Sequence, residues 1–99
     1  MISKMLNRKV IVRGDRSGVF FGTLVAKEGT EVKLENCRRI WYWAGAASIS
    51  QLATEGVKRP DDCNFTVTVD EIIITDAIEI IPCTESAIEN IESVKVWKR

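Results

Sequence analysis

Short runs of β-branched and aromatic residues, separated by turn-forming residues, make up the first third of the chain. Residues 9–13 and 19–25 are rich in Val, Ile and Phe, and the segment 14–18 (GDRSG) lies between them. Residues 31–35 alternate between apolar and charged positions, which is typical of a strand with one buried and one solvated face. Glycines in the intervening segments favour tight turns. The pattern therefore predicts a meander of three antiparallel strands, with hairpin turns at 14–18 and 27–30.

The third strand leads into the aromatic segment 38–43 (RRIWYW). If the strand runs on unbroken, Arg39, Trp41 and Trp43 share the face opposite the buried one. A bulge at residues 36–37 reverses this assignment, so the register stays open at this point. In either register we expect the two tryptophans on the same side, because they are two residues apart.

Capping signals predict two short helices. Ser48 and Gln51 form a capping box, and Gly56 stands where a left-handed residue ends a helix, which gives a helix over 49–55. Thr84 begins a second helix. The apolar stripe of that second helix consists of Ala87, Ile88 and Ile91.

Four further segments have strand character. Residues 65–69 alternate, 72–74 and 78–81 are isoleucine-rich runs typical of buried strands, and 94–97 reads as a closing strand. The opening meander is similar to that of SH3-like and Sm-like barrels. We therefore predict a single domain over 1–99 of the α+β class, mainly β. Its expected core is a small bent antiparallel sheet or a partly open SH3/Sm-like barrel with two short helices.

Composition narrows the chemistry. The chain contains no histidine, which removes Ser-His and Cys-His catalysis, and it lacks the CxxC spacing of structural zinc sites. Its cysteines, Cys37, Cys63 and Cys83, are odd in number and far apart, so we expect reduced thiols. No apolar stretch approaches the roughly 20 residues of a membrane span. We predict a cytosolic protein that is not an enzyme and binds no cofactor, metal or membrane.

Charge is unevenly distributed although the net charge is zero. Residues 1–43 hold nine Lys/Arg against four Asp/Glu, and residues 44–99 hold five against ten. Either the basic half forms a face for anions, or the two halves attract each other within a chain or between subunits. The tryptophans and isoleucine runs also exceed what one small core covers, so we expect a homo-oligomer.

The segment around the tryptophans could hold a nucleotide. Indole rings stack on bases, arginines bind phosphates, and helix starts receive anions. The candidate ligand-binding residues are Arg38, Arg39, Trp41, Trp43, Gly45, Ser48, Ser50 and Gln51. Each also has a purely structural reading, as core or interface anchor, strand flank, close turn or helix cap.

Five segments together resemble a family of small proteins from tailed bacteriophages and prophages. They are residues 19–24, 38–43, 45–53, 70–73 and 80–84, and the likeness runs over nearly the whole chain. By analogy with phage anti-defence proteins, the resemblance implies sequestration of a nucleotide signal in the host bacterial cytoplasm. A module that docks on a host or phage protein and a barrel that binds nucleic acid are the alternatives. Zero net charge disfavours nucleic acid.

Overall fold

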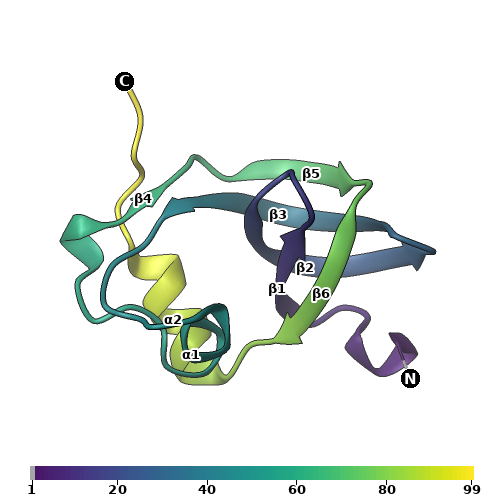
Figure 1. Cartoon of the computed structure of the whole chain (residues 1–99), viewed down its shortest axis with the longest axis horizontal. Helices are drawn as coiled ribbons and strands as arrows, with labels where there is room; N and C mark the ends of the chain where they lie inside the picture. Colours follow the sequence, from purple (N-terminus) through teal and green to yellow (C-terminus); the bar gives the residue numbers. More distant parts are fainter. Residues whose placement is uncertain (1) are drawn as a thin grey trace.

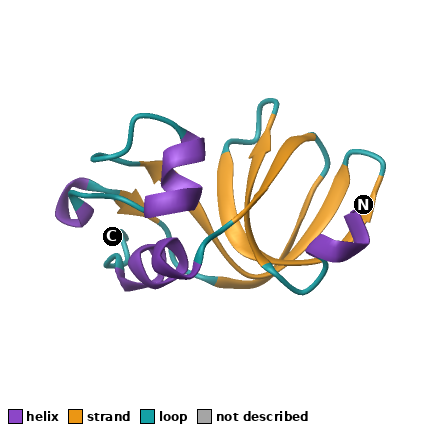
Figure 2. Cartoon of the chain, turned by 90° about the horizontal axis from the view of Figure 1, so that it is seen from below, coloured by secondary structure: helices purple, strands orange, loops and turns teal. Residues whose placement is uncertain are grey.

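Six antiparallel strands form one bent sheet in the computed structural model, which describes residues 2–99 (Figures 1 and 2). The strands are β1 (Lys9–Gly14), β2 (Val19–Glu28), β3 (Glu31–Tyr42), β4 (Asn64–Phe65), β5 (Val69–Ile74) and β6 (Ala77–Pro82). Their order is β4-β3-β2-β1-β6, and β5 also pairs with the long β3. The sheet does not close between β5 and β6. The predicted class, mainly β with a partly open bent sheet, is confirmed.

Two α-helices lie together at one end of the sheet (Figure 1). They are α1 (Ile49–Glu55) and α2 (Glu85–Ser93), and two 3₁₀ helices occur at Ile2–Met5 and Pro60–Asp62. The Ser48 side chain accepts a hydrogen bond from the Gln51 amide, Thr84 caps α2 in the same way, and Gly56 follows α1 with φ 78°. Both predicted helices are thereby confirmed. No helix within residues 2–99 has the length and apolarity needed to cross a membrane.

Each face of the sheet buries its own apolar cluster. Along β1, Val10 and Val12 belong to an inner cluster, whereas Ile11 between them belongs to an outer cluster. The inner cluster consists of the buried residues Val10, Val12, Phe20, Leu24, Val32, Leu34, Cys37, Ile74 and Ala77. The outer cluster includes Ile11, Phe21, Ile40 and Phe65 of the strands and Leu52, Ala53, Ala87 and Ile91 of the helices. The sheet thus curls around one cluster and packs on the helices through the other.

An extra residue in β3 decides which side chains face each cluster. The register pairs Thr23 with Glu35 and Phe21 with Arg38. Phe21 and Thr23 are two residues apart in β2, whereas their partners Arg38 and Glu35 are three residues apart in β3. β3 therefore contains one extra residue there, and Asn36, within this interval, has φ 49°. The bulge at residues 36–37, which the sequence left as an alternative, is present. Within the bulge, Cys37 lies in the inner cluster, and beyond it Arg38 and Ile40 turn toward the helices.

The turn at 14–18 is held by a carboxylate from the corner between β5 and β6. Asp76 accepts hydrogen bonds from the Arg16 amide (2.8 Å), the Ser17 amide (3.0 Å) and the Ser17 hydroxyl (2.5 Å). The Ser17 hydroxyl and the Arg16 amide, in that order, lower the pKa of Asp76. The predicted hairpin turn is confirmed, and these two turn amides are already bound by the protein's own carboxylate.

Three predictions about the later strands need correction. Residues 65–69 do not form one strand, because β4 ends at Phe65 and β5 begins at Val69. The predicted strand at 94–97 is reduced to a single bridge between Val96 and Phe65. The isoleucine runs are not fully buried: Ile73 is 61% and Ile78 50% exposed. Both lie on strands at the margins of the open sheet, where one side lacks a covering layer.

Candidate functional site

The structure separates the eight predicted site residues into three environments. Arg38 is buried at the junction of the sheet and α2, and Arg39 and Trp41 are exposed at the end of β3. The remaining five lie in the loop after β3, at the N-cap of α1 and in its first turn. The predicted pocket that joins all eight is therefore not formed within one chain.

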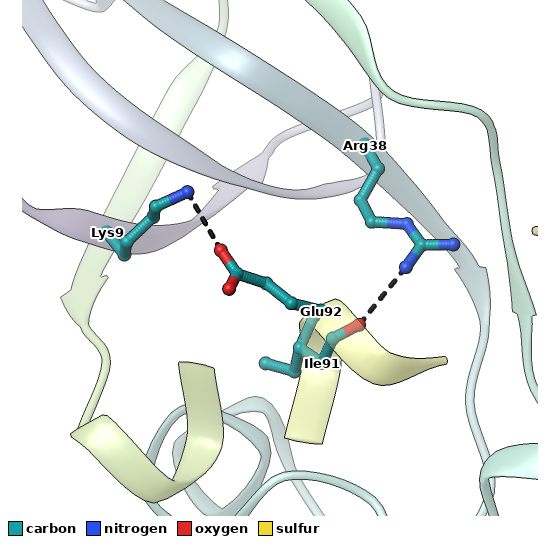
Figure 3. A network of polar contacts seen from close by, with 4 residues as sticks. All are labelled: Lys9, Arg38, Ile91 and Glu92. Atoms are coloured by element: carbon teal, nitrogen blue, oxygen red, sulfur yellow. Dashed lines mark hydrogen bonds and ion pairs between the residues drawn. The ribbon is translucent and has the colours of Figure 1, made fainter. Parts of the chain in front are cut away.

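Arg38 joins β3 to α2 and β4, and it is only 5% exposed. Its Nη1 donates to the carbonyl oxygens of Val94 (2.9 Å) and Ile91 (3.1 Å), the second of which Figure 3 shows. Its Nη2 donates to Phe65 O (3.2 Å) and its Nε to Thr66 O (3.1 Å). The guanidinium thus donates to four backbone carbonyl groups. These hydrogen bonds connect β3 to α2 and β4, and the donors point away from solvent.

The partners of Arg38 explain how a buried cation is tolerated. The last carbonyls of a helix carry partial negative charge, and Ile91 lies in the last turn of α2. Burial lowers the pKa of Arg38, since desolvation disfavours its charged form. Glu92 on the same turn bonds Lys9 of β1 (2.9 Å), as Figure 3 shows. The C-terminus of α2 is thereby fixed to two strands by cations.

Arg39, the next residue, points to the opposite side of β3. Its guanidinium lies 4.8 Å from the centre of the Phe20 ring and borders a hollow of about 280 Å³. The other residues lining the hollow are Phe20, Cys37, Thr66, Val69 and Ile72. Arg39 takes part in none of the three ion pairs found among residues 2–99. It is an exposed cation over an apolar floor.

Trp41 is 63% exposed, and its ring lies against that of Trp97 in the segment after α2. The ring centres of Trp41 and Trp97 are 5.5 Å apart, with an angle of 37° between the ring planes. The amide of Trp97 donates to Phe65 O (2.8 Å), which places the C-terminal segment beside β4. Trp97 was not among the predicted site residues. Its alternating segment predicts an extended conformation but does not identify which strand it meets.

Trp43 has different surroundings from Trp41. It is half-buried, packs against the outer cluster and donates its indole N–H to Ala46 O (3.2 Å). β3 ends at Tyr42, and its pairing with β4 is irregular between Ile40 and Tyr42. Strand alternation therefore does not extend to Trp43, and the two rings that the sequence placed together occupy different environments.

The loop and cap residues serve the start of α1. Gly45 has φ 90°, and a Cβ there would lie 2.6 Å from the amide nitrogen of Lys58. The side-chain oxygen Oε1 of Gln51 accepts a hydrogen bond from the Ala47 amide (2.8 Å). The backbone N–H of Gln51 donates to Ser48 Oγ (3.2 Å). Ser50 is exposed, and its carbonyl accepts from Thr54. Gly45, Ser48 and Gln51 therefore have structural partners, and none of the five lines the hollow beside Arg39.

The thiols are poorly suited to nucleophilic chemistry. All three cysteines are free, as predicted, and all three are buried. Burial raises the pKa of Cys37 to about 12, although the nearby charge of Arg39 opposes the shift. Burial likewise raises the pKa of Cys83 to about 12. Among residues 2–99, no three Cys, Asp or Glu side chains gather as metal ligands do.

The chain belongs to a protein family described as a domain of unknown function (DUF6948), whose model matches residues 7–91. A search of curated proteins finds no match. The matched region includes Arg39, Trp41 and the hollow, whereas Trp97 lies beyond its end.

Proposed function

We propose that this protein binds a small anionic, nucleotide-like ligand without catalysis, at a site formed by Arg39 and Trp41. The observation that carries the proposal is the pairing of an exposed, unpaired guanidinium with an exposed indole two residues away on β3. Consecutive strand residues advance by about 3.3 Å, so the two side chains start about 7 Å apart. A ligand that carries a charged group and a flat ring can therefore contact both side chains at once.

The two side chains offer complementary interactions to a nucleotide. Arginine forms bidentate hydrogen bonds to phosphate oxygens, and the cation–π contact with Phe20 holds the Arg39 guanidinium in place. The exposed face of Trp41 can stack on a base, an interaction that contributes about 1–3 kcal/mol. The hollow beside Arg39 gives room for the remainder of a small ligand.

The biological role that we propose is sequestration of a nucleotide signal by a homo-oligomer in the cytoplasm of a phage-infected host. The resemblance of segments such as 38–43 and 45–53 to small phage and prophage proteins supports this role. Binding rather than turnover is supported by the buried thiols with raised pKa. The thiol that lines the hollow beside Arg39 is that of Cys37, whose pKa burial raises to about 12.

A second candidate function is docking on a host or phage protein. It is favoured by Ile73 and Ile78, whose side chains are exposed on β5 and β6 at the margins of the open sheet. Unpaired strand edges with apolar side chains are common sites for pairing with another chain. This surface does not include Arg39 or Trp41, so the two candidate functions predict different sensitive residues.

A thermal-shift screen with mono-, di- and cyclic nucleotides tests the proposed function. A ligand at about 100 times its Kd adds about 2.7 kcal/mol of stability, which raises the Tm measurably. We expect one class of nucleotide to raise the Tm of the wild-type protein but not that of Arg39→Ala. Arg16→Ala is the matched control, because Arg16 is an exposed arginine in the turn at 14–18. If no nucleotide raises the Tm, or if both variants respond as the wild type does, the proposal is wrong.

A further inference from the structure

The chain beyond α2 forms an extended segment that lies beside β4 (Figure 1). Val96 makes a parallel bridge with Phe65, and the Trp97 amide donates to the same residue. The segment ends in Lys98 and Arg99, both exposed. Few backbone hydrogen bonds tie it to the sheet, whereas β3 is paired with β2, β4 and β5.

Trp97 and Trp41 form a tilted pair of aromatic rings. Their centres are 5.5 Å apart and their planes diverge by 37°. Stacked bases are spaced by about 3.4 Å, so two rings that enclose a base stand about 7 Å apart. The centres of Trp41 and Trp97 are closer than that spacing by about 1.5 Å, so a small movement of one ring makes room for a base.

We propose that Trp97 is the second wall of the ligand site, so that a planar base inserts between the rings of Trp41 and Trp97. This inference rests on the proposed function and names the chemistry that the site selects: an aromatic ring joined to an anionic group. Trp41 is the fixed wall because its two neighbours in β3, Ile40 and Tyr42, both pair with β4. Trp97 is the movable wall because its segment is lightly attached.

Charge at the end of the chain supports the same ligand class. Lys98 and Arg99 follow Trp97 directly and, like Arg39, take part in none of the ion pairs among residues 2–99. Cations that flank a stacking ring are the usual means of holding a phosphate next to its base. We infer that the movable wall brings positive charge as well as a ring to the ligand.

Binding of two probes separates the ring contacts from the charge contacts. We propose isothermal titration of the wild-type protein and its variants with ADP, and with inorganic pyrophosphate as the probe without a base. Trp97→Ala should weaken ADP binding by about 10- to 100-fold, as expected for the loss of one stacking face, and leave pyrophosphate binding unchanged. Trp97→Phe should retain most of the affinity for ADP. Arg39→Ala should weaken the binding of both probes.

The outcomes distinguish the clamp from the site itself. If Trp41→Ala and Arg39→Ala weaken ADP binding but Trp97→Ala does not, the clamp is wrong and the proposed function stands. If the wild-type protein binds neither probe and no nucleotide of the thermal-shift screen raises its Tm, both proposals fail. A truncation after Val96 must reproduce the loss seen for Trp97→Ala, and a Tm close to the wild-type value shows that the fold is retained. If ADP binding is lost with Lys98→Ser but not with Trp97→Ala, charge alone holds the ligand and the clamp is overturned.

Discussion

Arg38 and Arg39 are adjacent and chemically identical, yet they occupy opposite environments. Arg38 is 5% exposed and bonded to four carbonyl groups, while Arg39 is exposed over the ring of Phe20. Strand alternation sends the first toward the helices and the second toward solvent. One guanidinium thus fixes the tertiary structure, and its neighbour is available to a ligand.

The comparison shows that a basic pair in a sequence does not define an anion site. A guanidinium donates to carbonyl groups instead of phosphate when the fold places helix-terminal carbonyls around it. The carbonyl of Ile91, in the last turn of α2, does this for Arg38. Among residues 2–99, the Arg39 guanidinium contacts the ring of Phe20 and donates to no carbonyl group. The position of α2, and not the residue type, assigns the two roles.

Replacement of Arg38 should give the largest loss of stability. Arg38→Ala leaves the carbonyls of Phe65, Thr66, Ile91 and Val94 without this donor. Each buried unsatisfied group costs about 1–3 kcal/mol, and the costs do not add fully, so we expect a loss of about 3–5 kcal/mol. Urea denaturation measures it. Arg38→Lys should also lose stability, because an ammonium lacks the planar fork.

Arg39→Ala is the matched control for this prediction, with an expected change within about 0.5 kcal/mol for an exposed site. Equal losses in Arg38→Ala and Arg39→Ala would contradict the contrast between the two arginines.

Trp41 in β3 and Trp43, which follows the end of β3, should also differ in how much they contribute to stability. Trp43→Ala removes a half-buried ring from the outer cluster, and we expect it to cost about 2–4 kcal/mol. Trp41→Ala removes an exposed ring and should cost less than about 1 kcal/mol. Thermal denaturation of both variants checks the order. A lower Tm for Trp41→Ala than for Trp43→Ala would show that the Trp97 contact is structural.

The Asp76 carboxylate should make a smaller, pH-dependent contribution. Its pKa in the folded protein lies below the ordinary value of about 3.9, so its stabilising effect is complete above that value and is lost as the pH falls through the lower, folded pKa. Asp76→Asn should therefore be less stable than the wild type at pH 7, and the two should converge in acid. Asp15→Asn, in the same turn, is the control. A constant difference at all pH values would argue against this linkage.

Thiol reactivity should show the smallest effect and reports on opening of the fold. Because the pKa of Cys37 and of Cys83 is raised to about 12, little thiolate of either residue exists in the native protein at pH 8. We expect slow alkylation of these two cysteines in the wild type by iodoacetamide, measured by mass spectrometry at each site. Labelling should be faster in Arg38→Ala, whose folded state opens more often, and unchanged in Arg39→Ala. Rapid labelling of native Cys37 would contradict its burial.

Local sequence was sufficient for the elements whose signals are themselves local. The capping box at Ser48 and Gln51 predicted α1 with its observed bounds, and the alternation over 31–35 predicted a strand with Val32 and Leu34 buried. The turn at 14–18 was predicted as well. The long β3 was anticipated in part, since a bulge at 36–37 was one of two registers considered. These features depend on hydrogen bonds and periodicity within a few residues of each other.

The site depended on contacts between distant segments. The sequence placed Arg38 with the ligand residues and omitted Trp97, whereas the structure buries the first among carbonyls of α2 and brings the second against Trp41. Ile73 and Ile78 were expected in the core and lie at open margins. Burial and pairing of this kind are properties of which surfaces meet, and one β3 bulge reverses them for every side chain that follows. The residues themselves therefore determined the three strands of the opening meander, the helix caps and the turns, while tertiary packing decided which arginine and which tryptophans face solvent.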